Sequence, residues 1–313
     1  MNEIIRYGDI TLHPAFNCSA MNRNPVGHKR PIWGILSIIY SIFAVILYVL
    51  CLLVIKRKEN FKHSCYKIMF ILGISDLSCV IIMNFIIGIY MILGTIFCDM
   101  PNIYFGIACI HMASWISYCY FCVFLVINRL LDIVHPKNGI LIEIFAEKRL
   151  PIFVVIGILY GFYFSFFTWP VLYTDELITL ITNPKIFTDK DDLYHNKLLD
   201  FNDFLVCFIS CFLYIIYCVC VSNRYSNVQQ LKTSHKRIQI QILAQASLIC
   251  VLNCFSAVTY SLFLYIEVPH SIYPILFGIV QVGTAFPAFI YLILNKTIRD
   301  GVKSYLMRLC LAH

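Results

Sequence analysis

IWGILSIIYSIFAVILYVLCLLVI, residues 32–55, contains no charged side chain. A helix needs about 20 consecutive apolar residues to cross the ~30 Å hydrocarbon core of a bilayer. The whole chain shares this bias, because 60% of its 313 residues are hydrophobic and only 13% are charged. That composition leaves too few charges to cover a water-soluble enzyme and too many apolar residues for a disordered chain. The stretch therefore predicts a membrane-spanning helix.

Six further stretches have the length and composition of membrane spans. They cover residues 68–93, 103–128, 150–173, 204–221, 238–266 and 271–294. Transmembrane β-strands are alternating segments of about 10 residues, so these stretches are too long for a barrel. We therefore expect an all-α membrane protein, a seven-transmembrane helix bundle over residues 32–294. A tail over residues 1–31 precedes the bundle, and a tail over residues 295–313 follows it.

The 24 Lys and Arg residues divide unevenly between the two sides of the predicted bundle. The loops after the first, third and fifth spans, together with the C-terminal tail, hold 17 of them; the N-terminal tail and the loop 174–203 hold the other seven. Cytoplasmic segments carry an excess of basic residues. We therefore expect an extracellular N-terminus and a cytoplasmic C-terminus. The basic residues do not gather with interleaved aromatics, so we expect no nucleic-acid partner.

The 15 cysteines do not describe a disulfide framework. Eleven lie inside apolar runs, where a thiol behaves as a small hydrophobe, and no Cys or His spacing predicts a metal site. Cys18 and Cys98 are the only two expected outside the bilayer on the oxidising face, which makes them a candidate disulfide. Asn17, in Asn17-Cys18-Ser19, is a glycosylation candidate in the expected extracellular tail.

The C-terminal tail reads as a short amphipathic helix over residues 296–310. Ile298, Val302 and Leu306 share one face, while the basic residues of the tail can contact lipid headgroups. Gly301 weakens the helical pattern at its centre. Cys310, near its end, is a candidate for palmitoylation.

Polar groups inside a predicted span are costly and ask for an explanation. Asp76 is the only carboxylate well inside a span, where it serves either as a neutral interhelical contact or as part of a polar switch. Arg129 ends the third span and either extends to lipid phosphates or exchanges partners with a docked cytoplasmic protein. His111 lies about 27 Å from Arg129 along the helix, at 1.5 Å per residue. That distance puts His111 in the outer half of the bundle.

Several motifs together resemble those of a known receptor family. They are HSCYKIMFILGISD (63–76), FC (97–98), SW (114–115), NRLLD (128–132), GFYFSFFT (161–168) and GTAFPAFIYLILNK (283–296). The chain resembles a rhodopsin-like G-protein-coupled receptor and, more closely, a nematode serpentine receptor of class T. The resemblance extends over nearly the whole chain. It implies a chemosensory receptor that is not an enzyme, needs no cofactor, and passes an extracellular small-molecule signal to a heterotrimeric G protein.

The resemblance also suggests residues for the switch that couples to the G protein. Asn128-Arg129-Leu130 resembles the Asp-Arg-Tyr motif, but neutral Asn128 cannot hold Arg129 as a carboxylate would. The cytoplasmic end of the sixth span offers no acid either, so we expect no ionic lock there. Pro287 and Tyr291 resemble the Asn-Pro-x-x-Tyr motif, with the proline one residue early. With Asp76 of the second span, these residues are the candidate switch.

A ligand cavity is expected in the outer half of the bundle. From helix depth we place His111, Trp115, Phe263 and Gln281 around it, although Gln281 could equally join helices to one another. A transporter or channel is the alternative function, but it would need more paired intramembrane charges, broken helices or an internal repeat. We expect the receptor in the plasma membrane or the membrane of a sensory cilium, in contact with membrane lipid.

Overall fold

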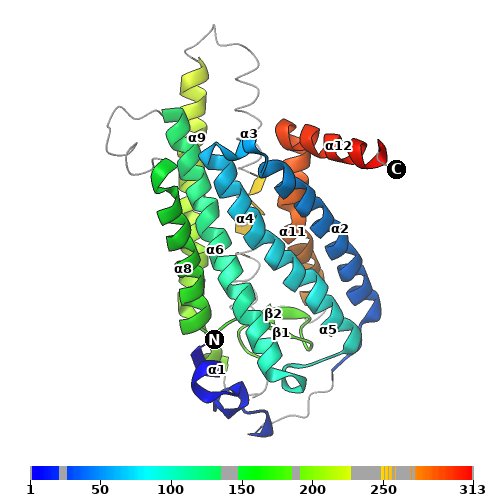
Figure 1. Ribbon diagram of the computed structural model, residues 1–313. Helices are drawn as coiled ribbons and strands as arrows, with labels where there is room; N and C mark the ends of the chain where they lie inside the picture. Colours follow the sequence, from blue (N-terminus) through cyan, green and yellow to red (C-terminus); the bar gives the residue numbers. More distant parts are fainter. Residues whose placement is uncertain are drawn as a thin grey trace.

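Long helices dominate the computed structural model, which describes residues 2–20, 27–134, 147–184, 191–226, 248–249, 251–252, 254–255, 258, 269 and 272–311. Their bounds are α2 (Pro31–Ile55), α4 (Ser64–Val80), α5 (Ile87–Leu93), α6 (Pro101–Val134), α8 (Leu150–Phe167), α9 (Lys197–Ser226), α11 (Tyr273–Leu294) and α12 (Lys296–Leu311). The short elements are α1 (Asn2–Tyr7), α3 (Lys58–Phe61), β1 (Leu172–Thr174) and β2 (Thr179–Ile181). The spans run side by side along one long axis (Figure 1).

Six helices among the described residues are long and apolar enough to cross a membrane. One of them is Ser64–Leu93, because a π-helical turn, Ile81–Ile86, joins α4 to α5 without a break. The predicted sixth span, 238–266, lies mostly outside the described residues. Large apolar side chains face outward along the spans; on α2, for example, Ile39, Phe43 and Ile46 are each at least half exposed. Such a surface suits lipid rather than water, which confirms the predicted helical membrane bundle.

Two predicted spans differ from the helices that form. The fourth was expected to reach residue 173, but α8 ends at Phe167 and Leu172 already belongs to a strand. Pro170 explains this end, because the residue before a proline is disfavoured in helical conformation. The fifth span was expected to begin at residue 204, but α9 begins at Lys197, where the Oδ1 atom of Asn196 accepts the backbone N–H of Leu199 at 3.0 Å.

α6 is the central helix and packs against α4, α8 and α9. Its contact with α8 depends on Gly161, where an added Cβ would lie 2.5 Å from the carbonyl oxygen of Ala113. Small residues allow membrane helices to approach this closely. The hydroxyl of Ser117 completes the contact by donating to the carbonyl of Gly157 at 3.2 Å.

The N-terminal segment and the β-hairpin close one end of the bundle, here called the N-terminal end (Figure 1). β1 and β2 are antiparallel, and Tyr173 pairs with Leu180 in their register. Phe16 is fully buried there, in a core that includes Phe105 and Tyr194. The hydroxyl of Tyr194 donates to the carbonyl of Ala15, so the N-terminal segment is packed into the fold.

α12 lies across the opposite end, called the C-terminal end (Figure 1). Asn295 separates it from α11 and caps it, because its Oδ1 atom accepts the backbone N–H of Ile298 at 3.2 Å. Ile298 and Val302 are buried, whereas Leu306 is 46% exposed, so only the first half of the predicted apolar face packs on the bundle. Gly301 supports this docking, since an added Cβ would lie 2.5 Å from the Val54 side chain.

Candidate functional site

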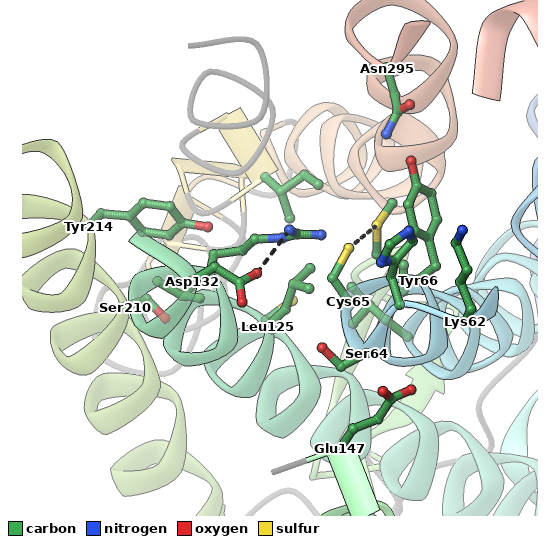
Figure 2. A pocket seen from close by; sticks show the side chains of 17 residues that line it. Lys62, Ser64, Cys65, Tyr66, Leu125, Asp132, Glu147, Ser210, Tyr214 and Asn295 are labelled. Atoms are coloured by element: carbon green, nitrogen blue, oxygen red, sulfur yellow. Dashed lines mark hydrogen bonds and ion pairs between the residues drawn. The ribbon is translucent and has the colours of Figure 1, made fainter. Parts of the chain in front are cut away.

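A cavity of about 390 Å³ opens at the C-terminal end of the bundle. Side chains from α4, α6 and α9, with Asn295 at the end of α11, surround it (Figure 2). Its floor is apolar and includes Met69, Leu72 and Leu125, while Arg129 and Tyr214 supply polar groups. The cavity therefore joins the ends of several helices that are far apart in the sequence.

Arg129 lines this cavity and pairs with a residue of its own helix. Its Nη1 atom lies 3.3 Å from the Oδ2 atom of Asp132, one turn further along α6 (Figure 2). The Arg129 side chain is 20% exposed and the Asp132 side chain is 52% exposed. The expectation that Asn128 does not hold Arg129 agrees with this pairing, but the role of Asp132 was missed. The i, i+3 spacing of opposite charges was the available sequence signal.

Asn128 forms a different contact, which joins α6 to α4. Its Nδ2 atom donates to the hydroxyl of Ser64 at 3.1 Å. Because Ser64 is the first residue of α4, this bond ties the start of one span to the end of another. Nearby, the ammonium of Lys67 lies 2.5 Å from a carboxylate oxygen of Glu147.

Asp76 and Tyr291 lie buried between the helices, deeper than the cavity. The hydroxyl of Tyr48 donates to the Oδ2 atom of Asp76 at 2.7 Å, which links α2 to α4. Tyr291 is buried, and its hydroxyl has no hydrogen-bond partner among the described residues. Pro287, inside α11, is also buried and does not interrupt the helix. These three candidate switch residues therefore belong to the helix core.

Gln281 takes part in contacts between helices. Its Nε2 atom donates to the Ser37 hydroxyl at 3.0 Å and to the Met83 carbonyl at 2.7 Å. The Nδ2 atom of Asn84 donates in turn to the Thr284 hydroxyl at 3.2 Å. These bonds join α2, α11 and the π-helical turn, so both amide hydrogens of Gln281 are already engaged. Gln281 therefore joins helices in this structure, and its role in ligand binding stays a prediction.

His111 and Trp115 lie one turn apart on α6, in the half nearer the N-terminal end. His111 is buried, and its Nδ1 atom has no hydrogen-bond partner among the described residues. The Nε1 atom of Trp115 donates to the Oδ1 atom of Asp203 at 3.4 Å. The fourth predicted cavity residue, Phe263, lies outside the described residues.

Asp203 is a buried carboxylate that sequence reasoning assigned to the loop before the fifth span. It is 5% exposed, lies inside α9, and also accepts a bond from Asn202 at 3.1 Å. The missed signal was Asn196 followed by Asp200, because asparagine at a helix start and an acid in the first turn mark an N-terminus. Asp203 thus belongs with Trp115 as a candidate for ligand recognition.

A hollow of about 440 Å³ at the N-terminal end lies between α1, the end of α8 and the start of α9. Phe105, Trp169 and Asn196 line it. His111, Trp115 and Gln281, the three residues predicted for the ligand cavity that the structure describes, do not border this hollow. It is therefore separate from the region around His111.

The sequence candidates outside the spans lie at the two ends of the bundle. Cys18 and Cys98 form a disulfide with a sulfur–sulfur distance of 2.05 Å. Asn17 precedes it, and its Oδ1 atom accepts the backbone N–H of Ser19 at 3.0 Å in an exposed turn. Cys310 is exposed at the far end of α12. Asp175 adds a further link, because it binds Arg30 beside the start of α2.

Comparisons with known proteins agree with this architecture. The family described as serpentine type 7TM GPCR chemoreceptor Srt matches residues 3–312. The chain is 21% identical over 300 residues to serpentine receptor class T-55 of Caenorhabditis elegans, covering 94% of this chain and 81% of that protein. Its fold resembles the crystal structure of squid rhodopsin, with a TM-score of 0.65, 15% identity, and coverage of 87% and 79% of the two chains. The chain belongs to the serpentine Srt family of G-protein-coupled chemoreceptors and is an integral membrane receptor, not an enzyme.

Proposed function

We propose that this receptor binds an extracellular small molecule in the N-terminal half of the bundle and couples to a heterotrimeric G protein through the cavity at its C-terminal end. The observation that carries the proposal is the position of Arg129 in that cavity, paired with Asp132 of its own helix. Because its ion pair with Asp132 lies within α6, the Arg129 guanidinium can change partner without breaking an interhelical ion pair.

The proposed orientation places the N-terminal end outside the cell, in the plasma membrane or a ciliary membrane. The uneven distribution of Lys and Arg favours it. The Cys18–Cys98 disulfide supports it as well, because disulfides persist on the oxidising side of a membrane. Glycosylation at Asn17 and palmitoylation at Cys310 are further expectations of the same orientation.

The proposed ligand region lies around His111, Trp115 and Asp203. Buried polar groups are nearly always hydrogen-bonded, so the unpartnered Nδ1 atom of His111 is a site at which a ligand can gain a bond at little cost. The Asp203 carboxylate supplies acceptor oxygens on the facing helix. This set favours a small, largely apolar ligand that carries a hydrogen-bonding group.

In this scheme, ligand binding shifts the population toward a state with an open C-terminal end. Phe263 remains a proposed lining residue. Asp76, Asn128, Pro287 and Tyr291 remain the proposed switch, because each is buried within the bundle, where side chains must repack when the helices move. The hydroxyl of Tyr291 has no partner among the described residues in this state, so a new partner in the open state would favour opening.

The test is a ligand screen on cells that express the receptor together with a G-protein-activation reporter. Arg129→Ala is expected to abolish the response to a ligand found on the wild type. Arg308→Ala is the matched control, because it removes an equal charge from an exposed position on α12 outside the cavity. An N-terminal epitope counted on unpermeabilised cells normalises expression and tests the orientation. A full response from Arg129→Ala would contradict the proposed coupling role.

A His111→Ala variant tests the ligand region separately. It is expected to raise the half-maximal ligand concentration about 10-fold or more, the equivalent of one hydrogen bond of about 1.4 kcal/mol. The maximal response should be retained, because His111 lies far from the proposed coupling cavity. No observation on the described residues favours the transporter or channel alternative, and the family consists of receptors.

A further inference from the structure

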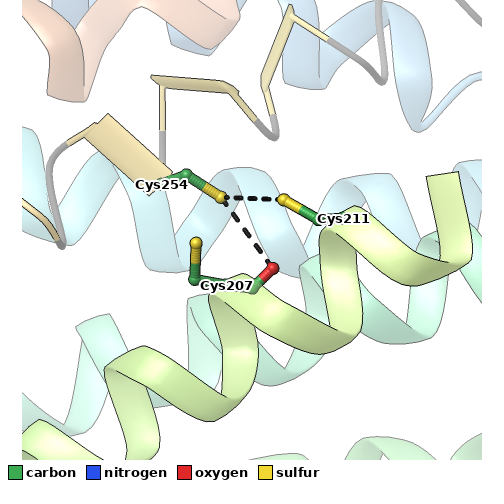
Figure 3. A group of neighbouring side chains, drawn as sticks. All are labelled: Cys207, Cys211 and Cys254. Atoms are coloured by element: carbon green, nitrogen blue, oxygen red, sulfur yellow. Dashed lines mark hydrogen bonds between the residues drawn. The ribbon is translucent and has the colours of Figure 1, made fainter. Parts of the chain in front are cut away.

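Three thiols from two separate segments converge on one face of α9. Cys207 and Cys211 are one helical turn apart on that helix, and Cys254 approaches them from the region of the predicted sixth span (Figure 3). The Sγ atoms of all three lie within 4.8 Å of one another. The Sγ atoms of Cys211 and Cys254 are 3.7 Å apart, and Cys254 also points at the Cys207 carbonyl, 4.0 Å away.

This spacing fits a shared metal ion. A metal–sulfur bond of about 2.3 Å places the sulfur atoms of one coordination sphere about 3.8–4.0 Å apart in tetrahedral or trigonal geometry. The 3.7 Å separation of Cys211 and Cys254 is close to that range. Small side-chain rotations, which move each sulfur atom by a fraction of an ångström, would bring Cys207 into the same coordination sphere.

The donor set selects a soft ion. The group consists of thiols alone among the described residues, with no carboxylate or imidazole in it. Thiolate sulfur favours Cu(I), zinc and iron–sulfur clusters over the ions that prefer oxygen. Structural zinc sites have four ligands, whereas the described residues of this group offer three, which is a coordination number that suits Cu(I).

Binding releases protons from the thiols, because the thiolate is the form of cysteine that ligates a metal. Each sulfur that bonds to Cu(I) gives up its proton to the solvent, and the metal keeps its oxidation state.

We propose that Cys207, Cys211 and Cys254 form a binding site for a soft monovalent metal ion, Cu(I), that bridges α9 and the segment containing Cys254. Cys211 is exposed on the helix surface and provides the route of entry, while Cys207 and Cys254 are half-buried behind it. The site is independent of the G-protein coupling proposed above, because none of its residues lines the cavity at the C-terminal end.

Binding is measured on the purified full-length receptor in detergent, with Cu(I) kept reduced by ascorbate without oxygen. Competition with a chromophoric Cu(I) chelator reports the affinity. One Cu(I) per receptor is expected in this site, with the affinity falling at least about 10-fold in Cys211→Ser, because a hydroxyl replaces a soft ligand. Cys218→Ser is the matched control, as it removes an exposed thiol two turns further along α9. Equal affinity in the wild type and Cys211→Ser would overturn the proposal.

Alkylation of the wild-type protein provides a test that no folding defect can obscure. Cu(I) is expected to slow the reaction of all three thiols with a membrane-permeant maleimide, read out by peptide mass spectrometry, while Cys218 reacts at an unchanged rate. Equal alkylation of the three thiols with and without Cu(I) would overturn the proposal. So would a Cys211–Cys254 disulfide in the protein isolated without metal, because oxidised sulfur does not ligate Cu(I).

Discussion

The Cys18–Cys98 disulfide is expected to contribute about 3 kcal/mol to the stability of the N-terminal end. For a fully random chain, its sequence separation of 80 residues corresponds to about 4.5 kcal/mol of loop-closure entropy at 25 °C. Most of that loop consists of α2 and the α4–α5 span, which stay inserted in the membrane when the N-terminal end opens. Only about 18 residues, before Pro31 and after Leu93, gain freedom, which lowers the figure to about 3 kcal/mol.

The perturbation is Cys98→Ser, compared with Cys18→Ser and with the double variant. All three should lose the same free energy, because each breaks the same bond. The assay is unfolding followed by tryptophan fluorescence in detergent. Trp169 reports the N-terminal end, since its ring lies 5.2 Å from that of Phe16. For a chain of this size the midpoint should fall by roughly 4–5 °C.

Cys310→Ser controls for the loss of a thiol as such, because Cys310 is exposed at the other end of the molecule. Its midpoint should match that of the wild type. The reasoning fails if mass spectrometry finds the Cys18–Cys98 bond in the wild type and Cys98→Ser nevertheless unfolds at the same temperature. It also fails if the double variant loses about twice as much as either single variant.

Three further predictions concern helix contacts and the N-terminal segment. Gly161→Ala should destabilise the fold by about 1–3 kcal/mol through overpacking against α6. Gly106→Ala is the control and should be neutral or stabilising, because no atom lies within 4 Å of the added Cβ. Thermal unfolding in detergent compares the two variants. Tyr48→Phe should cost about 1–3 kcal/mol in the same assay, because it leaves an oxygen of buried Asp76 without its donor. Asp9 accepts hydrogen bonds from the backbone N–H and then the hydroxyl of Thr11, and these bonds lower its pKa below 3.8. The ionised carboxylate therefore stabilises the fold above pH 3.8, and this stabilisation is lost as the pH falls through the lowered pKa. The unfolding midpoint of Asp9→Ala should therefore lie below that of the wild type at neutral pH and converge with it in acid; a constant difference across that range would contradict the assignment.

The helical membrane bundle could be predicted from the chain alone because each span is an uninterrupted apolar run. Spanning a bilayer satisfies the backbone within each helix, so the prediction needs no knowledge of neighbouring helices. The Srt family was equally readable from the motifs around Asp76, Arg129 and Pro287, and the family match confirms it. The ends of the spans were less predictable from the sequence. α9 already includes Asp200 and Asp203 near its start, because both carboxylates are buried against other elements.

Within the candidate site, too, the sequence predicted some residues but not their contacts. Arg129 was identified from its motif, but its pairing with Asp132 depends on the rotamers that the end of α6 adopts. Gln281 had two open roles in the sequence, and only the structure shows its hydrogen bonds to Ser37 and Met83 on neighbouring helices. No sequence spacing connects Cys254 to α9, so the thiol cluster could not be predicted at all.

The sequence by itself determined which segments enter the membrane and which family the receptor belongs to, because hydropathy and motifs are local properties of the chain. Only the tertiary structure decided which polar groups meet between the spans, where the cavity lies, and that the N-terminal segment is packed into the bundle. The physical reason is that a lipid-facing and a helix-facing apolar residue look alike in sequence. Helix rotation and register, set by close contacts such as that at Gly161, determine which side chains face each other.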